Sequence, residues 1–129
     1  MTNVLIRTES HFTVDRKSIR RAVEGVLCEK GVRGNAEISV SIVGDRLMKN
    51  LNKKYRNLDE TTDVLSFPLA GDAHSPFVGP PDGILYLGDI VVSYPQARDE
   101  AAEENKKLEE KINELVIHGL LHLLGQHHD

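Results

Sequence analysis

Four of the six histidines lie within the last twelve residues, HGLLHLLGQHHD. His118 and His122 are one helical turn apart, so on a helix both imidazoles project from the same face. Gly125 stands where a helix can end in a left-handed turn, and His128 follows that turn. Three imidazoles without a fourth protein ligand are typical of a catalytic zinc site, whose open position takes water or substrate. The spacing therefore predicts a site for Zn²⁺ at His118, His122 and His128, or for another transition metal, because imidazole also suits other late first-row ions.

The residue after His118 bears on the class of enzyme. Zinc peptidases with this histidine spacing carry a glutamate directly after the first histidine, and it serves as general base. This chain has Gly119 there, so a peptidase mechanism has no obvious base. Leucines and other apolar residues surround the pair on nearly all sides, which predicts a helix buried on most sides. A zinc-dependent hydrolase of another, peptidase-like substrate class stays open, and so does a non-catalytic protein whose metal is structural.

Charge is distributed unevenly along the chain. The formal net charge of -4 argues against a protein that coats nucleic acid by general electrostatics. Residues 45–56 nevertheless hold five basic residues against one acid, whereas residues 99–114 hold seven acids against three lysines. Either segment can be an ordinary solvated helix face, but a local basic face also suits contact with a few phosphates.

Hydrophobic periodicity indicates the elements that must position these residues. The predicted strands span residues 3–8, 35–44, 63–69 and 84–93, and the predicted helices span residues 14–31, 45–55, 93–107 and 108–124. Residues 70–83, rich in Gly and Pro, are expected to form a long loop. This order predicts an α+β fold: one domain over residues 1–129, with a small mixed four-stranded sheet packed against about four helices and a metal-binding helix like that of zinc hydrolases at the C-terminus.

The helix of residues 45–55 carries the basic residues. Asp45 is expected to cap it. Four residues are expected to face inward, namely Leu47, Met48, Leu51 and Tyr55, while Arg46, Lys49 and Lys53 share the outer side.

Composition narrows the cellular setting. No apolar stretch is long enough for a membrane span, and the first ten residues lack the features of a signal peptide. We therefore expect a cytoplasmic protein without a membrane partner. The single Cys28 cannot form an internal disulfide and is interpreted as a bystander.

Three blocks of sequence together resemble one known family, the YbeY endoribonucleases. The blocks are LNKKYRNLDETTDVLSFPL, LGDIVVS and HGLLHLLGQHH, in that order. The family consists of metal-dependent bacterial proteins linked to ribosomal RNA maturation and ribosome quality control. The resemblance implies that His118, His122 and His128 are the zinc ligands and that Arg56 is an arginine important for activity. It also implies a single-strand-specific endoribonuclease that acts at the 3′ end of 16S ribosomal RNA, with the ribosome or ribosome-assembly proteins as partners.

The chain departs from the family pattern near the metal site and before the third predicted strand. Gln126 and His127 replace the usual aromatic residue and aspartate, and Thr61 replaces a proline. Many relatives continue past the motif with an acidic tail, where this sequence stops at Asp129. These changes leave the three ligands and the arginine intact, but His127 or Asp129 can add a ligand.

A mechanism follows as a hypothesis. The metal would polarise a phosphodiester oxygen, activate a water, or both. Arg56 would hold the phosphate or stabilise its developing charge. Three lysines can guide the RNA backbone or be ordinary surface charge: Lys49, Lys53 and Lys54. Asp63 and Asp89 are candidate general bases, although Asp63 also suits a hydrogen bond at a turn or strand end.

Overall fold

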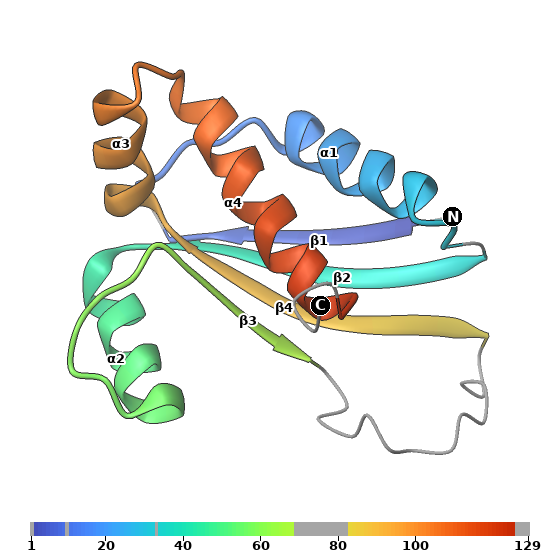
Figure 1. Cartoon of the computed structure of the whole chain (residues 1–129), viewed down its shortest axis with the longest axis horizontal. Coiled ribbons are helices and arrows are strands. Elements are labelled where there is room, and N and C mark those ends of the chain that lie inside the picture. Colours follow the sequence, from blue (N-terminus) through green and yellow to red (C-terminus); the bar gives the residue numbers. More distant parts are fainter. Residues whose placement is uncertain (1, 10, 33, 69–82, 126–129) are drawn as a thin grey trace.

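The computed structural model describes residues 2–9, 11–32, 34–68 and 83–125. Within these ranges the elements follow the predicted order β-α-β-α-β-β-α-α (Figure 1). The strands are β1 (Thr2–Thr8), β2 (Asn35–Val43), β3 (Val64–Pro68) and β4 (Ile84–Ser93), and the helices are α1 (Arg16–Glu29), α2 (Asp45–Arg56), α3 (Tyr94–Glu103) and α4 (Leu108–Leu123). The predicted α+β class is confirmed, whereas most of the predicted loop 70–83 lies outside the described residues.

The strands form one mixed sheet in the order β1-β2-β4-β3. β1, β2 and β4 run parallel, and β3 pairs antiparallel with β4 at the edge of the sheet. The strict alternation of β2 explains its central place, because every second side chain from Ala36 to Ile42 is buried against the helices. At the other end of this order, β3 is an edge strand, so one of its sides has no neighbouring strand in the sheet.

Helices cover both faces of the sheet (Figure 1). α1 and α4 pack on one face, where the main core gathers Ile19 and Val23 of α1, Val116 and Leu120 of α4, and the inward residues of β2 and β4. α2 packs on the opposite face, where Met48 joins a smaller apolar cluster with residues of the three strands nearest to it. Each fully buried aliphatic side chain of this kind contributes about 1.5–3 kcal/mol to folding. The two clusters hold α2 and α4 on opposite sides of the same strands.

The structure corrects three details of the sequence predictions. α3 ends at Glu103 and not near Lys107. Gly44 occupies the N-cap position of α2, so Asp45 is its first helical residue and not its cap. Leu47 and Tyr55 are 38% and 55% exposed, because α2 rests on the sheet over only one narrow stripe. Within the described ranges, no helix is long and apolar enough to cross a membrane.

Candidate active site between α2, β3 and α4

Arg56, His118 and His122 border one cavity of about 440 Å³. Its lining comes from the end of α2, from β3 and the two residues before it, and from α4: Arg56, Thr62, Asp63, Val64, Leu65, Ser66, His118, Gly119 and His122. The tertiary structure thus brings together the described residues that the sequence singled out for metal binding and phosphate binding. His128 lies outside the described residues.

The two histidines of α4 lie side by side. Their ring centroids are 4.9 Å apart, as expected for residues one turn apart on one helical face. Both residues are exposed, so the prediction of a helix buried on most sides is wrong at these positions. The buried face of α4 lies elsewhere on the helix, at Ile112, Leu115, Val116, Gly119 and Leu120 among others. The imidazoles therefore need no buried partner to offset desolvation, and they face an open cavity.

The donor set of this cavity suits a transition metal. Two neighbouring imidazoles are ligands that zinc accepts, and a catalytic site adds a third protein ligand while one position stays open. Among residues 2–9, 11–32, 34–68 and 83–125, no group of three or more His, Cys, Asp or Glu side chains is placed to hold an ion. The pair thus fits part of a zinc site, and the predicted third ligand, His128, stays a prediction.

Gly119 allows α4 to approach the sheet closely. A Cβ atom at this position would lie 2.8 Å from Cγ2 of Ile90, a fully buried residue of β4. Real Cβ atoms do not come so close to another carbon, so a larger residue would push the helix outward. Gly119, which stands where a zinc peptidase has its glutamate base, therefore also has a packing role, and the sequence pattern did not reveal this role.

Arg56 is the last residue of α2, and the chain turns sharply after it. Asn57 has a left-handed backbone (φ 59°) and caps the helix, with its N–H donating to the carbonyl of Lys53 at 3.1 Å. The fully buried Asn52 then holds the next segment, because its Nδ2 donates to the carbonyl of Glu60 at 2.9 Å. Asn52 is a residue that the sequence analysis missed. The sequence could have revealed it, because Asn52 is a polar residue on the inward face of an amphipathic helix.

Asp45 ties the start of α2 to the end of β4 and to the start of α3. Its Oδ1 accepts hydrogen bonds from Oγ1 of Thr61 at 3.0 Å and from Oγ of Ser93 at 2.9 Å. Nε2 of Gln96 also donates to it, at 3.3 Å. One carboxylate thus joins the start of α2, the segment that leads into β3, and the start of α3. The placement of Arg56 relative to the sheet depends on this junction.

The two candidate bases lie in different places. Asp63 borders the cavity, and its main-chain carbonyl accepts a hydrogen bond from the N–H of Ser93 at 2.9 Å. Burial, and next the neighbouring Asp63 carboxylate, raise the pKa of Glu100 above its usual value. Asp89 instead borders a separate hollow of about 320 Å³ on the α2 side of the sheet, together with Tyr55 and Phe67. Only Asp63 therefore stands beside Arg56 and the histidines.

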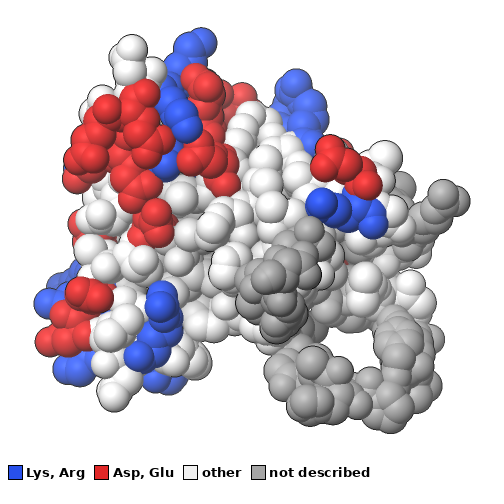
Figure 2. Space-filling model, in the orientation of Figure 1, with Lys and Arg blue, Asp and Glu red and all other residues white. Residues whose placement is uncertain are grey.

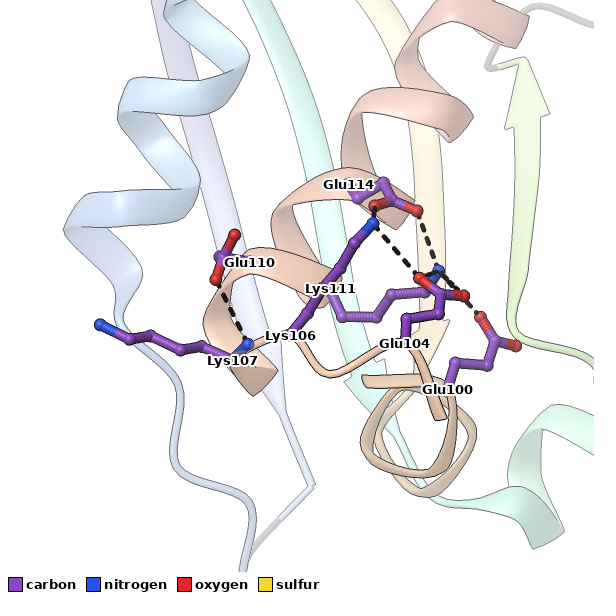
Figure 3. A network of polar contacts seen from close by, with 7 residues as sticks. All are labelled: Glu100, Glu104, Lys106, Lys107, Glu110, Lys111 and Glu114. Atoms are coloured by element: carbon purple, nitrogen blue, oxygen red, sulfur yellow. Dashed lines mark hydrogen bonds and ion pairs between the residues drawn. The ribbon is translucent and has the colours of Figure 1, made fainter. Parts of the chain in front are cut away.

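A network of charged side chains joins α3 to α4 (Figure 3). Nζ of the buried Lys111 lies 3.3 Å from a carboxylate oxygen of Glu100, 3.0 Å from one of Glu104 and 2.9 Å from one of Glu114. Lys106 also contacts Glu114. Hydrogen bonds from Lys106 and then Lys111 lower the pKa of Glu114 to about 2. The hydrogen bond to Glu114, followed by those to Glu104 and Glu100, raises the pKa of Lys111. The network fixes the half of α4 that precedes the histidines.

Charges of opposite sign gather on different elements (Figure 2). Acidic side chains cover α3 and the first half of α4, whereas lysines and arginines lie along α2. Three lysines of α2 are exposed, as predicted: Lys49, Lys53 and Lys54. Nζ of Lys49 lies 3.9 Å from Oδ1 of Asp59. The basic face of α2 leads directly to Arg56 and the cavity.

Comparisons with known proteins agree over nearly the whole chain. The family model described as Endoribonuclease YbeY matches residues 5–129. The protein named Endoribonuclease YbeY from Roseiflexus castenholzii is 44% identical over 129 residues, which cover 100% of this chain and 80% of that protein. Its namesake from Dehalococcoides mccartyi strain 195 is 36% identical over 132 residues, covering 98% of this chain and 77% of that protein. The solution structure of TM1509 from Thermotoga maritima is similar with a TM-score of 0.57 and 28% identity, covering 93% of this chain and 71% of that one.

Proposed function

The chain belongs to the YbeY endoribonuclease family, and we propose that it hydrolyses phosphodiester bonds within single-stranded RNA at the cavity between α2, β3 and α4. One observation carries this proposal beyond the family name. A guanidinium group from α2 and two neighbouring imidazoles from α4 border the same cavity, although α2 and α4 pack on opposite faces of the sheet. That combination can hold a phosphate next to metal ligands.

His118 and His122 would hold a zinc ion together with His128. Their exposed imidazoles at 4.9 Å between ring centroids support this assignment, and the absence of a cysteine in the cavity lining argues against a closed structural site. When bound, the ion supplies a Lewis acid for the negative charge on a phosphodiester group. Gly119 leaves no carboxylate base directly after His118, which disfavours peptide hydrolysis.

Arg56 would bind the scissile phosphate. A guanidinium group presents parallel N–H donors that match two phosphate oxygens, and it stays charged at every physiological pH. Such a donor stabilises the charge that develops on the phosphate during the reaction. The exposed lysines of α2 would guide the RNA backbone toward it, which gives binding that weakens as salt rises.

Ribosomal RNA is the substrate we propose for the cell. The resemblance of the three sequence blocks implies maturation of the 3′ end of 16S ribosomal RNA and a role in ribosome quality control, with the ribosome or its assembly proteins as partners. The acidic net charge supports a selective substrate, because it disfavours general coating of nucleic acid.

The test combines metal content with cleavage. Wild type, His118→Ala and Arg56→Ala are purified, their zinc is measured, and each is incubated with a labelled single-stranded RNA. We expect His118→Ala to lose zinc and activity together, and Arg56→Ala to keep zinc while cleavage falls by about 10²–10³-fold, the usual loss for one charge-stabilising donor.

Arg21→Ala is the matched control, because it removes an exposed arginine of α1, which does not border the cavity. It should cleave as wild type does. Undiminished cleavage by folded His118→Ala, or no cleavage by zinc-loaded wild type, would contradict the proposal. Survival of cleavage with a 2′-deoxy nucleotide at the scissile position would show that water, and not the 2′-hydroxyl, attacks.

A further inference from the structure

The edge strand β3 runs along the wall of the cavity. The sheet order places it beyond β4, so only one of its sides is paired with another strand among the described residues. Val64 and Ser66 both border the cavity that holds Arg56 and the two histidines. The edge strand β3 is thus part of the lining of the site.

The hydrogen-bond register shows which groups point outward. The N–H of Ser93 donates to the carbonyl of Asp63 at 2.9 Å, so Asp63 faces β4 with its main-chain groups. In an antiparallel pair, facing and outward residues alternate, and the register therefore turns Leu65 inward and both Val64 and Ser66 outward. Pro68, the next outward position, agrees, because a proline has no N–H and is tolerated at an edge only where none is needed.

These outward groups have no main-chain partner in the part of the chain that the structure describes. Each outward residue of an antiparallel strand presents its N–H and its C=O on the same side. Val64 and Ser66 thus offer two donor–acceptor pairs along the outer edge of β3, about 6.8 Å apart because they are two strand steps of about 3.4 Å from each other. A ligand that satisfies them must supply both acceptors and donors.

We propose that the outer edge of β3 holds the RNA strand, with the N–H groups of Val64 and Ser66 donating to phosphate oxygens and their carbonyls accepting hydrogen bonds from ribose 2′-hydroxyls. This inference rests on the proposed function. Phosphates alone would leave the carbonyls unpaired, whereas ribose adds a hydroxyl donor that deoxyribose lacks. Arg56 in the same cavity favours a polyanion over a peptide strand, which would otherwise match such an edge. The edge therefore distinguishes RNA from DNA without reading the base sequence.

The first experiment follows amide hydrogen exchange in the wild-type protein, with zinc removed to prevent turnover, and with and without a single-stranded RNA dodecamer. We expect the Val64 and Ser66 amides to be protected only when RNA is bound, and the Leu65 amide to be protected in both states by its bond to β4. Exchange at Val64 and Ser66 that stays unchanged at saturating RNA would overturn the inference. Protection by an unrelated extended peptide but not by RNA would assign the edge to a peptide strand instead.

The second experiment compares Ser66→Pro with Ser66→Ala. The proline removes an outward N–H from a strand that already holds Pro68, whereas the alanine keeps this N–H and removes only the hydroxyl. We expect the KM for RNA to rise about three- to tenfold more in the proline variant, the worth of one hydrogen bond, with kcat changed less than KM. Wild type should bind RNA about tenfold more tightly than DNA of the same sequence.

The outcomes separate the two proposals. Equal KM values for the proline and alanine variants in a protein that cleaves RNA would refute the role of the β3 edge and leave the nuclease proposal standing. A wild-type protein that is loaded with zinc and cleaves no RNA would refute the nuclease proposal, and the inference about the edge would fall with it.

Discussion

Replacing Gly119 with alanine tests whether close packing of α4 on β4 sets the position of the histidines. The new methyl carbon would lie 2.8 Å from Cγ2 and 3.2 Å from Cγ1 of Ile90. Carbon atoms pack best at about 3.5–4.0 Å, so the helix or Ile90 must move by about 0.7 Å. Ile90 is fully buried in the main core and cannot swing away, which leaves the helix as the part that moves.

The expected change in stability is a difference of two effects. Overpacking a core costs about 1–3 kcal/mol, whereas replacing a helical glycine with alanine gains about 1 kcal/mol in helix propensity. Gly119→Ala should therefore lower the free energy of unfolding by up to about 2 kcal/mol. Gly25→Ala in α1 is the matched control, because a Cβ there meets nothing within 4 Å and the same propensity gain should appear alone. The difference between the two variants isolates the contact with Ile90, at about 1–3 kcal/mol.

Chemical unfolding of both variants measures this difference, and RNA cleavage measures its consequence. A shift of α4 moves His118 and His122 relative to Arg56, so kcat should fall by about tenfold or more, since a 1 Å misplacement at an active site can cost about 10²-fold. If Gly119→Ala proves as stable as Gly25→Ala and cleaves RNA at the wild-type rate, then the helix has room for a side chain and the reasoning is wrong.

Four further predictions concern the polar contacts and the metal. Lys111→Ala should lower the free energy of unfolding by about 2 kcal/mol in denaturant titrations, because it leaves three neighbouring carboxylates without their buried cation, and an unchanged midpoint would contradict this. The pKa of Glu114 is about 2 in the folded state and 4.5 ordinarily, so its contribution to stability is present above pH 4.5 and disappears as the pH falls toward 2. Glu114→Gln should therefore make the denaturation midpoint fall less steeply with pH in the acid range. Asp45→Ala should destabilise by about 2 kcal/mol and lower RNA cleavage, whereas Asp45→Asn, which keeps the accepting Oδ1, should lose less of both. One equivalent of Zn²⁺ should raise the thermal midpoint of wild type but not of His118→Ala, and equal shifts would show that the ion binds elsewhere.

Local periodicity explains why the order of elements could be read from the sequence. The alternation of β2 and the helical spacing of α1 and α4 are properties of a few consecutive residues, so they predict the same elements in any compact fold. The side-by-side placement of His118 and His122 follows from helical geometry in the same way. Burial was less predictable. Tyr55 and Leu47 are exposed although they follow a helical apolar spacing, because α2 buries only a narrow face, at Met48 and Asn52.

The sequence by itself determined the chemistry that is available: an arginine at the end of a basic helix, a histidine pair on one helical face, and a glycine where a peptidase needs its base. Only the tertiary structure decided that these groups meet. Arg56 and the histidines come from helices on opposite faces of the sheet, and they border one cavity because the edge strand β3 lies between them. The close approach allowed by Gly119, the junction at Asp45 and the outward main-chain groups of β3 all depend on contacts between residues far apart in the chain, and no local pattern of residues encodes such contacts.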